Sequence, residues 1–115
     1  MYFWLRLKAG TGKSTLVKFI IKALNIKEEK VRYIAYTGKA TNVLKSKGCL
    51  NAITAHKLLY HAKLMPNGKY LFNPKSELEG SPSLIVVDEV SMLPKDIWDL
   101  LCSHNVHIIA LGDPM

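Results

Sequence analysis

The feature that most constrains the fold of this chain is a glycine-containing loop at residues 9–15, which stands between a strand pattern and a helix pattern. Residues 2–7 are rich in aromatic and branched side chains, as expected of a strand, and apolar residues recur at helical spacing from Leu16 to Leu24. A strand, a glycine loop and a helix in this order can cradle phosphate groups, because loop N–H groups and the helix N-terminus point at one polyphosphate. The sequence therefore predicts a phosphate-binding loop.

The side chains of this loop suit a nucleotide with its magnesium ion. Lys13 can reach the terminal phosphates and assist their transfer, and the Ser14 hydroxyl can bind Mg²⁺. We therefore expect ATP and Mg²⁺ as ligands. The residues expected at the nucleotide are Ala9, Gly10, Thr11, Gly12, Lys13, Ser14 and Thr15.

One position departs from the full phosphate-loop pattern. The pattern G-x-x-x-x-G-K-[ST] has a glycine at the place where this chain has Leu7. If Leu7 impairs the cradle, the chain is a nucleotide-binding module without turnover, and this alternative stays open.

A pair of acids follows the apolar run at residues 84–87, which is typical of a strand buried on both faces. Ligands of open parallel sheets bind at the carboxyl ends of the strands, where Asp88 and Glu89 would lie. We expect Asp88 to complete the Mg²⁺ shell opposite Ser14, and Glu89 to orient and deprotonate the attacking water. A small-molecule kinase would not need Glu89, so that function is disfavoured.

The net charge of +7 is concentrated in residues 37–75. Seven of the 16 basic residues and none of the nine acidic residues lie there, so the charges of the remaining chain cancel. Lysines that neutralise phosphates and rings that stack on bases are typical of single-strand binding, which makes a nucleic acid the predicted partner. The alternative is a solvated lysine-rich surface. The rings are His56, Tyr60, His61, Tyr70 and Phe72.

Further elements are predicted along the chain. Strands are expected at residues 31–36 and 106–111, and helices after Gly38 and at residues 96–104. In the basic segment, Thr54 is the expected N-cap of a helix through His56 to Leu64, which ends at a turn at residues 66–68. That turn could join a small hairpin leading to residues 70–72, and residues 73–83 are expected to form a loop.

Length and composition predict one domain outside the membrane. A chain of 115 residues has room for a single core, and it contains no run of apolar residues long enough to span a bilayer and no leader pattern. Cys49 and Cys102 lack metal-binding spacing and are expected to be reduced thiols. We therefore expect a cytoplasmic protein.

Taken in order, these motifs resemble those of the first RecA-like motor domain of superfamily 1 DNA helicases, closest to the RecD-like and Dda-like branch. Residues 9–14 look like motif I, residues 36–40 like motif Ia, and residues 54–56 like the short Thr-x-His element. Residues 88–92 are similar to motif II, and residues 112–115 to the start of motif III. The resemblance spans nearly the whole chain.

The resemblance implies an α/β fold of the P-loop NTPase type, with a parallel sheet flanked by helices. Residues 1–115 would be the N-terminal part of this domain, with strands in the order motif I, motif III, motif II, motif Ia. Gly112 and Asp113 join the residues expected at the nucleotide. The residues expected against single-stranded DNA are Thr37, Gly38, Lys39, Thr54 and His56.

The family also implies an activity. In an intact relative such as the exodeoxyribonuclease V alpha subunit, ATP hydrolysis drives translocation on single-stranded DNA. A second RecA-like domain supplies an arginine to the ATP, so we expect the present chain to be part of a longer motor and to be inactive alone. A viral-type RNA helicase of the same superfamily is an alternative, since the preference for DNA over RNA depends on the resemblance.

Overall fold

A computed structural model describes residues 2–5, 13–49 and 51–112, with side chains described from residue 16 onward. The strands of its main sheet are β1 (Tyr2–Leu5), β2 (Val31–Ala35), β3 (Ile53–Thr54), β6 (Leu84–Val87) and β7 (His107–Leu111). A separate hairpin consists of β4 (Tyr60–Leu64) and β5 (Tyr70–Pro74). The helices are α1 (Lys13–Ala23), α2 (Gly38–Ser46), α3 (Ala55–Leu59) and α4 (Lys95–Cys102), with 3-10 turns η1 (Glu28–Lys30) and η2 (Val90–Met92).

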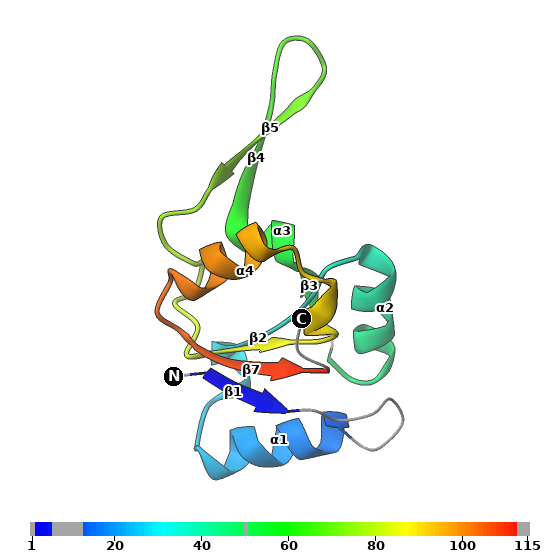
Figure 1. The fold of residues 1–115 in the computed structure, drawn as a ribbon, viewed down its shortest axis with the longest axis vertical. Helices are drawn as coiled ribbons and strands as arrows, with labels where there is room; N and C mark the ends of the chain where they lie inside the picture. The colour runs from blue at the N-terminus through cyan, green and yellow to red at the C-terminus, as the bar shows by residue number, and fades with distance from the viewer. Residues whose placement is uncertain (1, 6–12, 50, 113–115) are drawn as a thin grey trace.

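The main sheet is parallel throughout, in the order β1-β7-β6-β2-β3 (Figure 1). The first four strands have the predicted order motif I, motif III, motif II, motif Ia, and the two-residue strand β3 extends the edge beyond β2. The prediction of an α/β fold with a parallel sheet and flanking helices is confirmed. Every strand of this sheet therefore presents its carboxyl end at the same edge.

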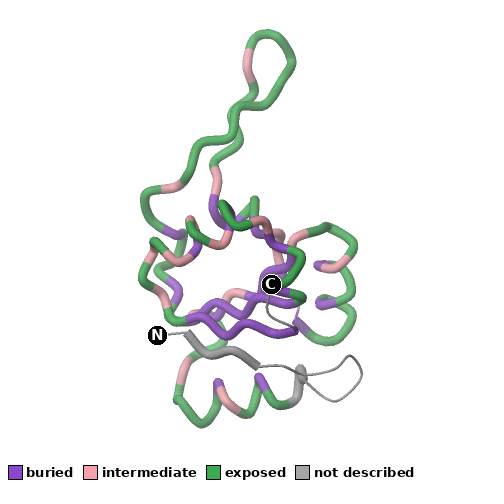
Figure 2. Tube along the Cα trace, viewed as in Figure 1, coloured by how far each residue is buried: buried purple, intermediate pink, exposed green. Residues whose placement is uncertain are grey.

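The central strands are buried (Figure 2). Both of their faces are covered because alternate residues enter two separate cores. In β6, Ile85 and Val87 pack on the side of α3 and α4, whereas Leu84 and Val86 pack on the side of α1 and α2. Strands β2 and β7 divide in the same way. The result is three layers, with the sheet between two layers of helices.

Threonine side chains fix the start of two helices. The Thr37 Oγ1 accepts a hydrogen bond of 3.1 Å from the Ala40 N–H at the start of α2. At the start of α3, the Thr54 Oγ1 accepts one of 3.2 Å from the Lys57 N–H. Both threonines are N-caps, as predicted for Thr54, and each caps the helix that follows a strand of the main sheet.

One predicted helix is wrong in its second half. The helix that Thr54 caps ends at Leu59, and residues 60–64 form a strand that pairs antiparallel with Tyr70–Pro74. The hairpin turn explains the difference, because the Met65 N–H donates to the Lys69 carbonyl at 2.8 Å and Gly68 has a φ of +82°. The predicted loop at residues 73–83 likewise starts late, since β5 runs to Pro74.

The hairpin projects from the body of the molecule and is almost entirely exposed (Figures 1 and 2). Its base is fixed to the body at Leu59, which is fully buried and whose carbonyl accepts a hydrogen bond of 2.8 Å from the Lys75 N–H. The hairpin therefore depends on the main core only through its base.

Two leucines test this arrangement. Leu59→Ala removes a fully buried side chain and should lower the free energy of unfolding by about 2–5 kcal/mol. Leu64→Ala, the matched control in the hairpin, removes a side chain that is 61% exposed and should change it by less than about 0.5 kcal/mol. Urea denaturation of both variants gives the comparison, and equal losses would contradict the isolated position of the hairpin.

Candidate functional site

The parallel sheet gathers the predicted nucleotide residues at one edge. Asp88 and Glu89 follow β6, and Gly112 follows β7, the strand that pairs with β6. Strand β1, which precedes the predicted phosphate loop, lies on the other side of β7. The ends of these three strands are thus neighbours, as expected for ligand sites of open parallel sheets.

The predicted phosphate loop is described only where it enters the helix. Helix α1 begins at Lys13 and contains Ser14 and Thr15 in its first turn, so the backbone confirms the predicted helix start. The other residues predicted to bind the nucleotide lie outside the described residues. They are Ala9, Gly10, Thr11, Gly12 and Asp113.

Asp88 is a buried carboxylate at the carboxyl end of β6. It is 8% exposed, and its backbone N–H donates to the Ile34 carbonyl at 2.9 Å, which continues the pairing of β6 with β2. Among the described side chains it is the only buried acid, and a carboxylate in that position requires compensation by a cation or by hydrogen-bond donors. A carboxylate oxygen is also the ligand that Mg²⁺ prefers, so Asp88 fits a magnesium site.

Glu89 turns the chain sharply away from β6. Its φ of 49° and ψ of 56° are left-handed, a conformation that costs energy for a residue with a Cβ and that is concentrated at functional sites. The turn exposes the Glu89 side chain while Asp88 stays buried. The two adjacent acids therefore have different environments, which suits two different roles.

Gly112 provides the surface beside Glu89. It has a φ of +106°, and a Cβ added there would lie 3.6 Å from the Glu89 Cα and 3.8 Å from its Oε2. The end of β7 thus approaches the end of β6 closely. Glu89 and Gly112, which belong to separate motifs in the sequence, therefore lie side by side.

A small pocket of about 250 Å³ joins Glu89 to the end of β2. Thr37 and Glu89 were predicted as site residues, whereas Tyr36 and Met92 were predicted only as members of the segments that resemble motifs Ia and II. The position of Tyr36 directly after β2 could have indicated it, because this strand end meets the same sheet edge. The pocket is lined by Tyr36, Thr37, Ala40, Glu89 and Met92.

The residues predicted to contact nucleic acid lie at the ends of β2 and β3. Thr37, Gly38 and Lys39 are exposed at the start of α2. His56 is exposed in α3, just after the N-cap residue Thr54. Because β2 and β3 are paired and parallel, these two groups leave the sheet at the same edge.

Three rings connect these groups. The His56 ring lies 5.8 Å from the Tyr36 ring and 5.6 Å from the Tyr60 ring, with interplanar angles of 41° and 26°. Tyr36 belongs to the pocket with Glu89, and Tyr60 begins the hairpin. A row of rings therefore runs from the sheet edge that bears Asp88 and Glu89, here called the acid edge, to the base of the hairpin.

Two other titratable residues have raised pKa values. Burial raises the pKa of the Cys49 thiol, and burial together with the charge of Glu28 raises the pKa of the Tyr33 phenol. Both pack in the core on the side of α1 and α2. Cys49 is 5% exposed, which assigns it to the core.

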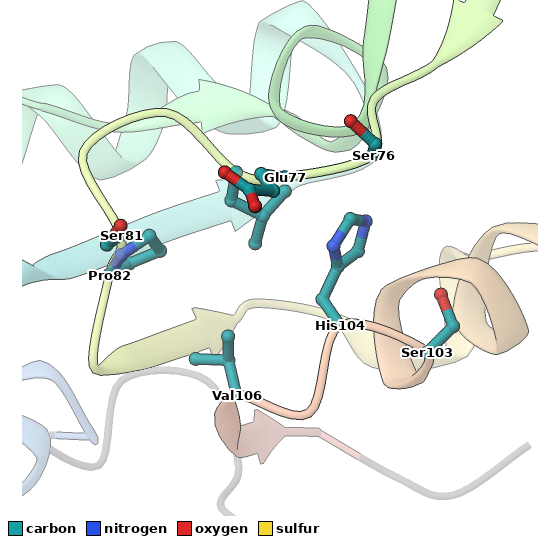
Figure 3. A pocket seen from close by; sticks show the side chains of 8 residues that line it. Ser76, Glu77, Ser81, Pro82, Ser103, His104 and Val106 are labelled. Atoms are coloured by element: carbon teal, nitrogen blue, oxygen red, sulfur yellow. The ribbon is translucent and has the colours of Figure 1, made fainter.

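A different pocket, of about 370 Å³, lies at the opposite edge of the sheet (Figure 3). Its residues come from the segments that precede β6 and β7, and the His104 side chain points toward the segment that contains Ser76 and Glu77. This position separates it from Asp88, Glu89 and Gly112, which follow the same strands. The pocket is thus no part of the proposed nucleotide site.

Comparison with known protein families identifies the type of domain. Residues 4–115 match the family described as an AAA domain. The chain belongs to this AAA domain family. Its members have P-loop ATPase-like domains, so membership implies nucleotide binding. The curated proteins gave no significant match. No helix within the described ranges is long and apolar enough to cross a membrane.

Two glycines test the geometry of the site. Gly112→Ala forces a side chain into a φ of +106° and should lower the free energy of unfolding by about 1–3 kcal/mol. Gly38→Ala is the matched control, since nothing lies within 4 Å of an added Cβ in the first turn of α2, and it should be neutral or stabilise by up to about 1 kcal/mol. Thermal unfolding distinguishes them, and a harmless Gly112→Ala would argue against the positive φ at the end of β7.

Proposed function

We propose that this AAA domain is the first motor domain of an ATP-dependent superfamily 1 helicase of the RecD-like branch, which couples ATP hydrolysis to movement along single-stranded DNA. The observation that carries the proposal is the pair Asp88 and Glu89, one buried and one exposed, at the end of a central parallel strand beside Gly112. The acid-free basic segment at residues 37–75 supports the nucleic-acid partner.

Each residue of the edge has a separate task in this mechanism. Lys13 would neutralise the terminal phosphates, and Ser14 and Asp88 would hold Mg²⁺. When bound, Mg²⁺ supplies positive charge to the phosphate oxygens. Glu89 would accept the proton of the attacking water, a role that suits an exposed carboxylate next to the buried Asp88.

An arginine from outside these residues would complete the mechanism. The charge that develops on the transferred phosphoryl group is usually stabilised by an arginine, which contributes on the order of a thousandfold or more in rate. Arg32 lies near the amino end of β2, and its guanidinium donates to the Glu29 carbonyl at 2.7 Å and the Glu79 carbonyl at 3.2 Å. This arginine is engaged near the amino end of its strand, and Arg6 lies outside the described residues. A second motor domain is the proposed source of the catalytic arginine.

A nucleotide-binding module without turnover is the second candidate, favoured by Leu7 in place of the first loop glycine. Both candidates require ATP to bind, and only the first requires a nucleic acid. The third candidate is a helicase that moves along RNA in place of DNA. Nucleotide and strand binding therefore test different parts of the proposal.

For nucleotide binding, we expect Lys13→Ala to weaken the affinity for a non-hydrolysable Mg-ATP analogue more than tenfold, because it removes the cation that faces the terminal phosphates. Lys22→Ala, in the last turn of the same helix, is the control and should bind as the wild type does. Isothermal titration of the three proteins gives the affinities. Equal affinities for all three would refute the nucleotide site.

For strand binding, the logarithm of the affinity for oligo(dT) should fall linearly with the logarithm of the salt concentration. Lys39→Ala should reduce this slope by about 0.7, the value for one phosphate contact on a single strand. Lys22→Ala again serves as the control and should leave the slope unchanged. Fluorescence anisotropy at several salt concentrations measures it, and a slope that Lys39→Ala leaves intact would return the lysines to a role in solubility.

A further inference from the structure

The hairpin has one apolar face that is exposed beyond its base. Side chains of directly paired residues share a face, and faces alternate along each strand. The pairs Tyr60 with Pro74, Ala62 with Phe72 and Leu64 with Tyr70 therefore form one apolar face. Leu64, Tyr70 and Phe72 are 61%, 62% and 54% exposed. An exposed apolar face of this kind is typical of a binding surface.

The opposite face of the hairpin is mixed. It contains the pairs His61 with Asn73 and Lys63 with Leu71. Leu71 is 46% exposed, close to the value for its neighbour Phe72. The two residues thus differ in face but not much in exposure, which makes them a matched pair for experiments.

A pocket of about 410 Å³ lies at the base of the hairpin, between α3 and the two strands. Aromatic rings come from both strands and from α3, and the His56 ring of α3 stacks on the Tyr60 ring of β4 at 5.6 Å. Polar and basic groups line the remaining wall. The lining residues are Thr54, His56, Lys57, Tyr60, His61, Ala62, Phe72 and Lys75.

A second pocket, of about 450 Å³, shares Lys57 and Lys75 with the first. It adds Arg32 and Glu79, so that three cations face one acid. The Lys75 Nζ donates to the Lys57 carbonyl at 3.3 Å, which holds this side chain at the boundary between the pockets. A ring-lined pocket thus adjoins one with excess positive charge.

We propose that the base of the hairpin is a stacking site for the bases of a single strand, and this inference depends on the proposed nucleic-acid function. A base stacks in the first pocket against Phe72 and the Tyr60 ring, while the neighbouring phosphate lies against Lys57 and Lys75. The row of rings joins this site to His56 and Tyr36. A single strand would then continue from α2 past the hairpin base.

The charge of the region favours this occupant. Residues 37–75 contain seven lysines and no acid, so a second copy of the same basic surface would be repelled. A nucleic acid supplies both the phosphates for the lysines and the flat bases for the rings. An anionic lipid surface supplies the charge but no ring to stack, which makes it an outcome that the experiment must separate.

The experiment compares Phe72→Ala with Leu71→Ala, using the full 115-residue chain and two oligonucleotides of equal length and charge, oligo(dT) and an abasic strand. Phe72→Ala should weaken oligo(dT) binding by about 5- to 150-fold, the range for loss of one stacked base. Its effect on the abasic strand should be small, and Leu71→Ala should leave both affinities within about twofold of the wild type. Phe72→Trp should restore binding. Circular dichroism verifies that each variant is folded.

Each other result has a definite meaning. Equal losses for Phe72→Ala and Leu71→Ala, or an equal loss on the abasic strand, would overturn the stacking site but leave strand binding intact. Failure of the wild type to bind either oligonucleotide would overturn the nucleic-acid part of the proposed function as well. Phe72-dependent binding to phosphatidylserine vesicles without an effect on oligonucleotides would assign the face to a membrane and overturn the proposal.

Discussion

The rest of this structure depends on the parallel pairing of β6 with a strand on each side. A parallel strand in this position must bury both of its faces, and Leu84–Val87 meets that requirement with four apolar side chains that alternate between two cores. Burial on both faces forces helices onto both sides of the sheet. Parallel pairing also brings the carboxyl ends of β1, β7, β6 and β2 to the same edge of the sheet, so motifs far apart in sequence meet there.

The sequence was sufficient for those parts of the fold that local pattern determines. The continuous apolar run before Asp88 predicted a buried strand, and the strand order followed from the resemblance. The predicted helix at residues 60–64 was wrong because its apolar spacing also fits a strand, and only pairing with Tyr70–Pro74 decides between the two. Long-range pairing outweighed local periodicity there, since the turn at Gly68 brings the two segments together.

The candidate site was predictable as a set of residues but not as a geometry. Asp88 and Glu89 were predicted from their place after a strand. The left-handed turn at Glu89, which leaves Glu89 exposed beside Gly112 while Asp88 is buried, has no signal in the local sequence. The contact of Tyr36 with His56 is likewise tertiary. No pattern within either segment specifies it, because it depends on β2 and β3 being paired.

The row of rings connects the sheet edge that bears Asp88 and Glu89 to the hairpin, but this connection alone does not couple the two sites. Tyr36 shares a pocket with Glu89 and contacts His56, which stacks on Tyr60 at the hairpin base. Contiguity alone carries no coupling, because a coupled element needs two arrangements that each ligand favours differently. The main sheet is packed on both faces and offers one arrangement. In the proposed motor, the effect of ATP hydrolysis at Glu89 would therefore reach the bound single-stranded nucleic acid through the exposed elements around the sheet edge. Of these elements, the hairpin is the least constrained by the core.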